Sequence, residues 1–390
     1  MKRRLAVHLS VWIALAAVVR VVVVPAETCP AVTADEVRSA IDGTLGWIIG
    51  NVDEDGRYLY GYDLETDQIS PSYNAARHAG VTMALYQAYE ALGDPAILAA
   101  ADRGLAYMLD RVETRDGWAA WGPPGSDLPV GANGLLLAGL ALRRRATGDG
   151  LHDGLMRQVA RFLVQQQEPG GAIPAYWDRS SETPLSGVYG PFATGEAAWA
   201  LVLAGRAFPA EEWLDAGLRT VDYIARERDR AEGYLARLPD HWAAYALGDL
   251  PPEALDADRV ILGRRLAGYF GMRLRFESQR TGEGINLWVR WYPGPPAGVG
   301  TAGEGIAALQ RLAEADVGLG DLRANIEERM ICIAGIMVER QIGPADAARL
   351  PRPQLAEGAW FYRGYTQMDG QQHVLSALLG ALRVLEGEAA

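Results

Sequence analysis

The stretch GAWFYRGYTQMDGQQH, residues 358–373, leads into an almost wholly apolar run over residues 374–385. A glycine and aromatic side chains come first, a polar cluster follows, and the apolar run predicts a helix that is buried on all sides. Variants of this order recur along the chain. The glycine-aromatic loops lie around Gly56, Gly117, Gly171, Gly233, Gly284 and Gly358, at spacings of 61, 54, 62, 51 and 74 residues. Recurrence at this interval predicts a closed or stacked array of helical hairpins.

Helix patterns between these loops are of two alternating kinds. Thr33-Ala34-Asp35-Glu36 has the form of a capping box and marks the first helix start. Helices with one charged face are expected over 33–50, 95–112, 151–167, 211–228, 256–271 and 321–341. Helices that are apolar around most of their circumference are expected over 74–92, 131–147, 192–206, 241–247, 301–315 and 371–385. The fold class is therefore all-α, with about twelve helices in six pairs and at most short ribbons in the Tyr- and Trp-bearing loops.

The lengths of the connections give an orientation to these pairs. Links from an apolar helix to the following amphipathic helix are short, and links back are long, glycine-rich and aromatic. With the apolar helices as an inner ring and the amphipathic ones as an outer ring, every long loop lies on one face, with the N-termini of the inner helices. Long loops on a rigid scaffold are where functional residues concentrate, so this face is the predicted mouth of a site.

Six hairpins of this kind resemble the (α/α)6 toroids of the six-hairpin glycosidases, an architecture shared by unsaturated glucuronyl hydrolases and sugar 2-epimerases. The resemblance covers residues 27–390 as one toroid domain and implies a carbohydrate substrate. Terpene cyclases and lanthionine cyclases have related toroids. The chain lacks the Asp-x-Asp-Asp motif of the former and the Cys-His-Gly zinc motif of the latter.

Composition excludes several function classes. Lys2 is the only lysine, so a Schiff base, a pyridoxal phosphate linkage or a phosphate-loop lysine cannot form in the rest of the chain. The formal net charge is −12, with no basic run, which argues against a nucleic-acid partner. No Gly-x-Ser-x-Gly elbow, glycine-rich dinucleotide fingerprint or His-Glu-x-x-His motif occurs. We therefore expect no cofactor and no metal.

Residues 1–26 have the form of an export signal. A basic start at residues 2–4 precedes an apolar stretch from Leu5 to Val24, and Val24-Pro25-Ala26 fits a small-residue cleavage site. The segment is expected to be a signal peptide or, if it is retained, a membrane anchor over residues 5–24, with the protein extracellular or in the cell envelope. In that compartment Cys29 and Cys332 either form a disulfide or remain two free thiols.

Rare polar residues mark the starts of the six inner helices, and these starts converge on the predicted mouth. Three of the four histidines beyond the leader, His78, His241 and His373, lie there. Glu196 and Glu304 are candidate general acid and base, and His241, His373 or Asp369 could take either role. The candidates for substrate binding are Arg77, which could grip a sugar carboxylate, His78, Asn133, Gln372 and the aromatic residues Trp118, Trp177, Trp242, Trp291, Trp360 and Tyr362.

Each candidate also has a structural explanation. Acids and amides at helix N-termini are ordinary caps, and a loop tryptophan packs in the core more often than it binds a ligand. Weighed together, these residues predict an exported glycoside hydrolase that acts on an envelope or extracellular glycan through Glu196 and Glu304. The alternatives are a uronic-acid epimerase or lyase that uses His241 or His373 with Arg77, and a non-catalytic protein that binds a glycan or peptide. The sequence does not determine the sugar or the oligomeric state.

Overall fold

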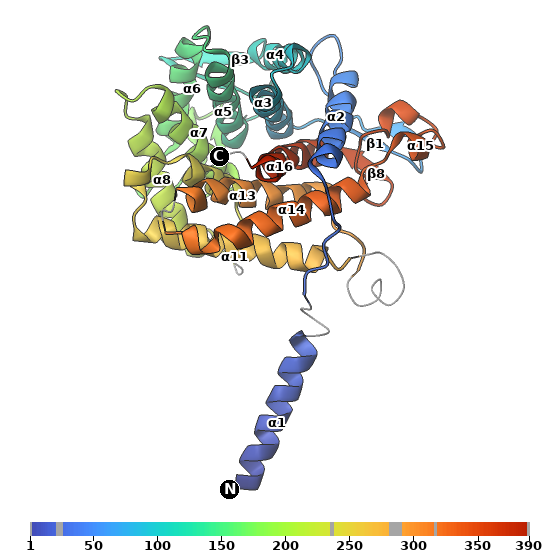
Figure 1. Cartoon of the computed structure of the whole chain (residues 1–390). Helices are drawn as coiled ribbons and strands as arrows, with labels where there is room; N and C mark the ends of the chain where they lie inside the picture. The colour runs from blue at the N-terminus through green and yellow to red at the C-terminus, as the bar shows by residue number, and fades with distance from the viewer. Residues whose placement is uncertain (1, 21–25, 235–237, 281–290, 316–317, 388–390) are drawn as a thin grey trace.

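The computed structural model describes residues 2–20, 26–234, 238–280, 291–315 and 318–387, and its main body is a ring of helices (Figure 1). The inner ring consists of α3 (Ala75–Leu92), α5 (Val130–Thr147), α7 (Ala193–Ala207), α10 (His241–Asp249), α13 (Pro296–Glu314) and α16 (Met368–Glu386). Each inner helix packs on the next in this order, and α16 packs on α3, which closes the ring. The predicted all-α (α/α)6 toroid is confirmed.

The outer helices pair one by one with the inner ones. They are α2 (Ala34–Gly50), α4 (Pro95–Leu109), α6 (Asp153–Gln166), α8 (Trp213–Arg226), α11 (Ala257–Glu277) and α14 (Arg323–Arg340). Five hairpins are consecutive in the chain, whereas the sixth joins its two ends, because α2 packs on α16. Thr33 caps α2 with the predicted capping box. Helix α1 (Lys2–Val18) and the short helices α9 (Arg228–Ala231) and α15 (Pro344–Ala347) lie outside the two rings.

Short antiparallel ribbons occupy the long loops, as the sequence predicted. β1 (Gly61–Asp63) pairs with β2 (Gln68–Ile69) and β8 (Tyr365–Gln367), which joins the first and last loops. β3 (Val112–Arg115) pairs with β4 (Trp118–Trp121). β6 (Tyr176–Asp178) pairs with β5 (Leu128–Pro129) and β7 (Thr183–Pro184). The ribbons surround the end of the toroid at which the inner helices begin.

Several helix boundaries differ from the sequence prediction, and two of the differences matter for the site. Helix α11 runs to Glu277 rather than to residue 271, so that it includes Arg273. Helix α4 ends at Leu109 rather than near residue 112, because the chain enters β3 there. Helix α13 begins at Pro296, five residues before the predicted start, since proline is favoured in the first helical turn. Glu304 therefore lies eight residues beyond the first residue of α13, roughly 12 Å along the axis. It sits deeper in the ring than predicted.

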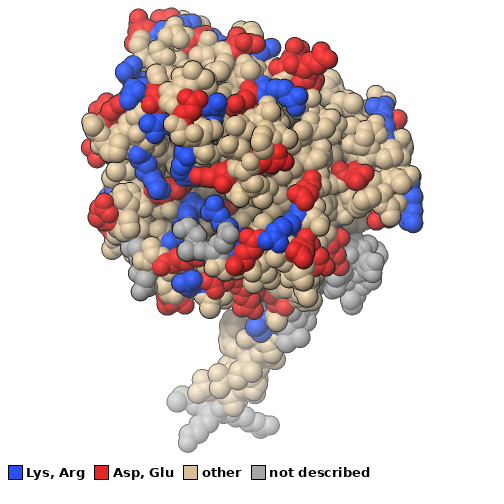
Figure 2. Space-filling model, turned by 45° about the horizontal axis from the view of Figure 1, so that its top comes forward, with Lys and Arg blue, Asp and Glu red and all other residues tan. Residues whose placement is uncertain are grey.

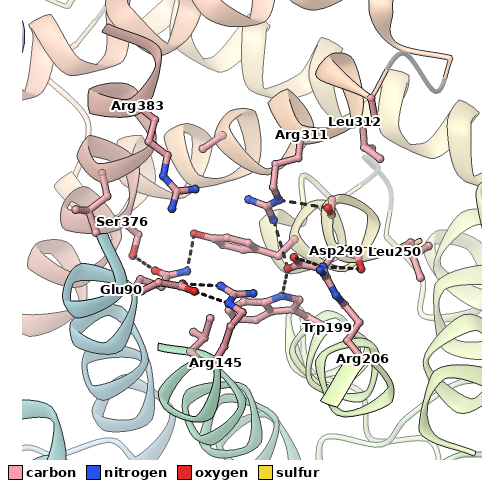
Figure 3. A pocket seen from close by; sticks show the side chains of 18 of the residues that line it. Glu90, Arg145, Trp199, Arg206, Asp249, Leu250, Arg311, Leu312, Ser376 and Arg383 are labelled. Atoms are coloured by element: carbon pink, nitrogen blue, oxygen red, sulfur yellow. Dashed lines mark hydrogen bonds and ion pairs between the residues drawn. The ribbon is translucent and has the colours of Figure 1, made fainter. Parts of the chain in front are cut away.

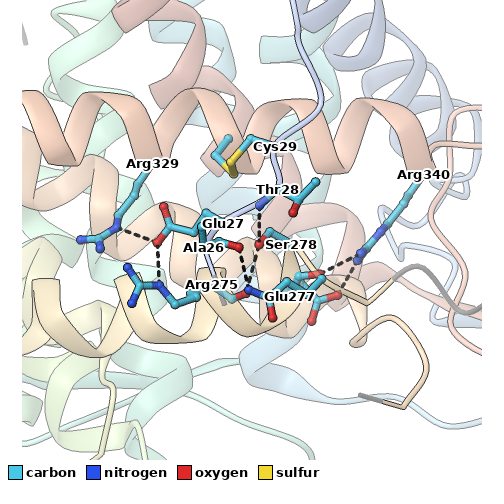
Figure 4. The surroundings of a disulfide bond; sticks show 11 residues. Ala26, Glu27, Thr28, Cys29, Arg275, Glu277, Ser278, Arg329 and Arg340 are labelled. Atoms are coloured by element: carbon cyan, nitrogen blue, oxygen red, sulfur yellow. Dashed lines mark hydrogen bonds and ion pairs between the residues drawn. A yellow bond between two sulfur atoms is a disulfide. The ribbon is translucent and has the colours of Figure 1, made fainter. Parts of the chain in front are cut away.

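The chain enters the ring through a strap, residues 26–32, that crosses α11 and α14 (Figure 4). Cys29 is joined to Cys332 of α14 by a disulfide with an S–S distance of 2.01 Å, which decides between the two states that the sequence left open. The Glu27 carboxylate lies 3.6 Å from Nε of Arg275 and 3.5 Å from Nε of Arg329. The strap packs closely on α14 at Gly335, where a larger residue would clash, because a Cβ there would lie 2.3 Å from the carbonyl oxygen of Pro30.

The predicted leader is described only in part. Helix α1 covers Lys2–Val18, and its side chains from Arg4 onward are exposed. Within the described part of the chain, no helix is both long enough and apolar enough to span a membrane. The expected cleavage site includes Val24 and Pro25, which lie outside the described residues, as does the loop around Gly284.

Charged side chains are interspersed on the outer surface. The face in Figure 2 carries acidic and basic groups side by side and shows no continuous basic area.

Candidate active site

A pocket of about 340 Å³ opens at the end of the toroid where the inner helices begin. This size falls in the usual range for small-molecule sites. Polar side chains from several inner helices reach it, as the loop lengths predicted. Its lining includes Asn74, Arg77, Phe192, Glu196, His241, Trp242, Arg273, Thr301, Asp369, Gln372 and His373. We call it the upper pocket.

At the base of the upper pocket, two histidines meet above one carboxylate. Nδ1 of His373 lies 2.6 Å from Oε2 of Glu304, and Nε2 of His241 lies 3.6 Å from the same oxygen. Gln372 Nε2 donates a hydrogen bond of 3.0 Å to Oε1 of Glu304. Glu304 is fully buried and is absent from the pocket lining, in keeping with its depth along α13. It therefore orients His373 from below.

The two histidines have opposite tendencies to carry a proton. Burial lowers the pKa of His241 well below its usual value, and the nearby His373 acts in the same direction. Burial alone would also lower the pKa of His373, but the carboxylates of Glu304, Asp369 and Glu196 outweigh burial and raise it. Burial thus keeps His241 neutral near pH 7, whereas the surrounding carboxylates favour the protonated form of His373. Two titratable groups whose pKa values are pushed apart in one pocket are natural partners in acid–base chemistry.

His241 is also free to act as a base. Its side chain is only 2% exposed, and neither ring nitrogen has a hydrogen-bond partner among the described residues. The ring centroids of His241 and His373 are 5.1 Å apart, and the two ring planes are nearly perpendicular, at 83°. Two buried nitrogens without hydrogen-bond partners lower the stability of the fold, and such an arrangement is typical of a site that binds a ligand.

Arg77 and Asp369 form the entrance side of the upper pocket. Nε of Arg77 lies 3.4 Å from Oδ1 of Asp369, which in turn lies 3.7 Å from Nε2 of His373. Arg77 also donates to the hydroxyl of Tyr60. The prediction that Arg77 lies at the mouth with the polar start of the last inner helix is confirmed.

Glu196 lines the upper pocket in a protonated state. Burial, together with the neighbouring Asp240, raises its pKa to about 8. Asp240 in turn caps α10 and forms a buried ion pair with Arg228. Gly131 of α5 provides the space, since a Cβ at that position would lie 1.8 Å from Oε2 of Glu196. At neutral pH, Glu196 is thus a proton donor.

We expect the Glu196→Gln substitution to stabilise the protein, and to do so more as the pH rises. The native carboxyl keeps its proton up to about pH 8, whereas the unfolded chain releases it near pH 4.5. Loss of this proton therefore stabilises the unfolded state more and more as the pH rises between these values. Each pH unit in that window lowers the free energy of unfolding by up to about 1.4 kcal/mol, and a glutamine, which does not titrate, avoids this loss. Urea unfolding of both proteins at pH 5 and pH 8 measures it. Glu54→Gln, on an exposed loop, is the control, and a gain that is equal at both pH values contradicts the account.

Several predicted binding residues have structural positions instead. His78 is fully buried, with Nε2 2.8 Å from the carbonyl oxygen of Gly104 and Nδ1 2.7 Å from the Tyr73 hydroxyl. Because the carbonyl only accepts, Nε2 carries the hydrogen and Nδ1 accepts from Tyr73. Burial lowers the pKa of His78 to about 4. Its ring connects α3 to α4 within one hairpin and does not line the upper pocket, where the sequence analysis expected it.

Asn133 and most of the aromatic candidates are likewise structural. Asn133 is fully buried and bonds the backbone N–H and carbonyl of Trp121, which fixes a loop to α5. Of the predicted aromatic surfaces only Trp242 lines the upper pocket. The others are buried in packing, half-buried away from the pocket or exposed outside it, namely Trp118, Trp177, Trp360, Tyr362 and Trp291.

Four polar or aromatic lining residues were not among the predicted site residues, and one of them, Asn74, is the N-cap of α3. Arg273 belongs to the outer helix α11, beyond residue 271, where the sequence analysis expected this helix to end. Phe192 and Thr301 lie near inner-helix starts but carry no distinctive motif. Arg273 forms no ion pair with the described residues, Glu277 interacts with it electrostatically, and its guanidinium adds positive charge to the pocket. No sequence signal distinguishes it from the other arginines of the outer ring.

One group in the described ranges has the donor spacing of a metal site. The ligand atoms of His241, Glu304 and His373 lie within 4.8 Å of one another. Two imidazoles and a carboxylate with an open side are a ligand set that zinc accepts. The hydrogen bond between His373 and Glu304 accounts for two of these three residues, whereas His241 has no hydrogen-bond partner among the described residues, and the absence of a metal stays a prediction.

Comparison with known proteins identifies the fold. No family model matches the chain, and no curated protein matches its sequence. Among solved structures, the chain is similar to a cellobiose 2-epimerase from Spirochaeta thermophila DSM 6192, with a TM-score of 0.65, 14% identity and coverage of 91% of this chain and 96% of the other. It is also similar to an unsaturated glucuronyl hydrolase specific for heparin, with a TM-score of 0.63, 13% identity and coverage of 91% and 99%.

A third similar structure has a hydrolytic description. It is Bt3792 from Bacteroides thetaiotaomicron VPI-5482, described as a glycoside hydrolase family 76 mannosidase, with a TM-score of 0.61, 13% identity and coverage of 91% and 98%. These proteins share the six-hairpin (α/α)6 architecture, so the predicted resemblance is confirmed. At such low identity the likeness establishes the fold and leaves the reaction to be argued from the site.

Proposed function

We propose that this protein is a carbohydrate-active enzyme that removes a proton from the carbon next to a carbonyl or carboxylate group of a sugar. The observation that carries the proposal is the pair of histidines that meet above Glu304 in the upper pocket, of which burial keeps His241 neutral while the nearby carboxylates favour the protonated form of His373. The similar structures described as an epimerase and as a glucuronyl hydrolase support a sugar as the substrate.

The pair is suited to a proton transfer that involves two neighbouring substrate atoms. A substrate atom that lay between the two rings would need ring centroids about 7 Å apart, because each contact takes about 3.5 Å. The centroids of the His241 and His373 rings are only 5.1 Å apart. Both histidines therefore approach the substrate from one side. His241 takes the proton from carbon, and His373 gives its own proton from Nε2 to the neighbouring carbonyl oxygen, which yields an enediol. Return of the proton to the neighbouring carbon gives an isomer, and its return to the opposite face of the same carbon, after the enediol has turned, gives an epimer. In a uronate the electron pair of the broken carbon–hydrogen bond instead expels the oxygen substituent on the β-carbon, which leaves with the proton of His373.

Glu304 supports this reaction without touching the substrate. Its carboxylate holds Nδ1–H of His373, so that Nε2 faces the pocket, and it stabilises the charged ring. Glu304 is therefore not placed to protonate a glycosidic oxygen. The pairing of Glu196 with Glu304 as hydrolytic acid and base is the weaker of the two hypotheses for that reason.

Glycoside hydrolysis remains the second candidate because of one observation. Glu196 is protonated at neutral pH and lines the upper pocket beside Asp369, so it could serve as the general acid with Asp369 as the base. Arg77 and Arg273 would hold an acidic sugar in either reaction.

A panel assay distinguishes these reactions. The protein is incubated with reducing mono- and disaccharides, uronate oligosaccharides and envelope or plant polysaccharides, and the products are followed by NMR. Ketoses, epimers or unsaturated uronates are expected. Release of new reducing ends without any of these favours hydrolysis by Glu196, and saturable binding without turnover indicates a glycan-binding protein.

We further propose that the protein is exported. The basic and apolar character of residues 1–24 supports export, and so does the disulfide between Cys29 and Cys332, because such bonds persist in oxidising compartments. The expected location is the cell envelope or the medium, and cell fractionation with an antibody to the C-terminus tests it. Recovery of the protein with its leader in the cytosol contradicts export.

A further inference from the structure

A second cavity lies at the other end of the toroid, where the inner helices finish (Figure 3). Its volume is about 480 Å³, and we call it the lower cavity. All six inner helices contribute to its lining. The indole of Trp199 and the ring of Tyr245 give it flat apolar surfaces, and Gln87 and Ser376 add hydrogen-bonding groups. The polar residues of the proposed reaction lie at the opposite end.

Four arginines from four different inner helices line the lower cavity. They are Arg145 of α5, Arg206 of α7, Arg311 of α13 and Arg383 of α16. The cavity contains two carboxylates, Glu90 and Asp249, which leaves two positive charges in excess. Such an excess is unusual in a protein whose formal net charge is −12.

Three of these arginines already have partners. Arg145 forms a bidentate pair with Glu90, at 2.5 and 2.6 Å. Arg206 lies 3.2 Å from Oδ1 of Asp249, and Arg311 lies 3.4 Å from Oδ2 of the same carboxylate. These contacts fix the positions of the guanidinium groups.

Arg383 is different. Its side chain is half-buried and, among the described residues, forms no ion pair, hydrogen bond or ring contact. Figure 3 shows its guanidinium group pointing into the same space as that of Arg311.

The ends of helices do not account for Arg383. Basic residues in a last turn often complement the negative end of a helix, and Arg206 and Arg311 do so by donating to the carbonyl oxygens of Asp249 and Gly248. Helix α16 is closed instead by Gly387, whose backbone N–H donates to the carbonyl oxygens at the helix end. The guanidinium of Arg383 is therefore available to a ligand.

We propose that the lower cavity binds the phosphate or sulfate group of a small molecule, with Arg383 as its principal donor and Arg311 beside it. The planar fork of a guanidinium matches such an oxyanion, and the remaining volume with Trp199 and Tyr245 accommodates an organic group of about sugar size. This site is separate from the upper pocket and does not depend on the reaction proposed there.

Calorimetric titration of the full chain tests the proposal. The probes are inorganic phosphate, inorganic sulfate, and glucose 6-phosphate against glucose, each at ionic strength held constant with chloride. Saturable binding of the anions is expected, with an affinity roughly tenfold or more weaker in Arg383→Gln. Arg383→Lys keeps the positive charge but lacks the planar guanidinium, so its anion affinity should lie between those of the unmodified protein and Arg383→Gln. Tighter binding of glucose 6-phosphate than of phosphate identifies an ester as the ligand, and equal binding identifies the free anion; both support the site.

Arg349→Gln is the matched control, because Arg349 lies on the surface with its side chain 78% exposed and pairs with Asp346 outside the cavity. Its anion affinity should equal that of the unmodified protein. The proposal is overturned if the unmodified protein shows no saturable anion binding, or if Arg383→Gln and Arg349→Gln bind with equal affinity.

Discussion

Replacing His373 or His241 by alanine is expected to lower kcat by roughly 10²- to 10⁴-fold, the usual contribution of a general acid or base. His373 supplies the proton that Glu304 helps it to retain, and His241 supplies the unoccupied nitrogen that receives one. Because both act on the same substrate, the double variant should lose little more than the worse single variant. Steady-state kinetics on the sugar found in the panel assay measure these losses.

His152→Ala is the control for this experiment. His152 lies before α6, outside the upper pocket, and its replacement should leave kcat unchanged. Circular dichroism must show that all variants keep their helices. Full activity in folded His373→Ala and His241→Ala would remove the histidines from the reaction and return the hydrolytic hypothesis with Glu196 to first place.

Replacing both Cys29 and Cys332 by serine is expected to lower the free energy of unfolding by about 2–5 kcal/mol. The bond closes a loop of 303 residues in sequence, and a long loop gives a large reduction in the entropy of the unfolded chain. It also holds the strap on α11 and α14, where Glu27 meets Arg275 and Arg329. Urea unfolding of the oxidised protein and of the double serine variant gives the difference.

The control is the unmodified protein in a reducing agent, which should unfold at the same urea concentration as the double serine variant. Since the strap lies far from the histidine pair in sequence and on the outer helices, kcat should change little. Equal stability of the oxidised protein and the variant would show that the strap is held by its noncovalent contacts alone.

The helical architecture could be predicted because its signals are local. Apolar and amphipathic helices differ in the distribution of side chains around one axis, and caps such as Thr33 or Gly93 mark their ends. The repeated order of loop and helix then fixed the ring, and the start of the last inner helix brought Asp369, Gln372 and His373 to the upper pocket as expected.

The parts that could not be predicted depend on distances across the ring. Glu304 lies below the pocket because α13 begins at Pro296, and the sequence signal for the start at Thr301 was equally good. His78 resembles His241 in position, yet Tyr73 and Gly104 occupy both of its nitrogens. Arg273 reaches the pocket from an outer helix. None of these relations leaves a periodic pattern in one segment of the chain.

The fate of deuterium on the reacting carbon tests the central claim most directly. The sugar identified in the panel assay is prepared with deuterium on the carbon next to its carbonyl or carboxylate group, and its product is examined by NMR. Our account predicts that this carbon–deuterium bond is broken, with the label found in solvent or on the neighbouring carbon, and that His241→Ala abolishes the cleavage. A product that keeps all of the deuterium on its original carbon, with the configuration of that carbon unchanged, would contradict the account.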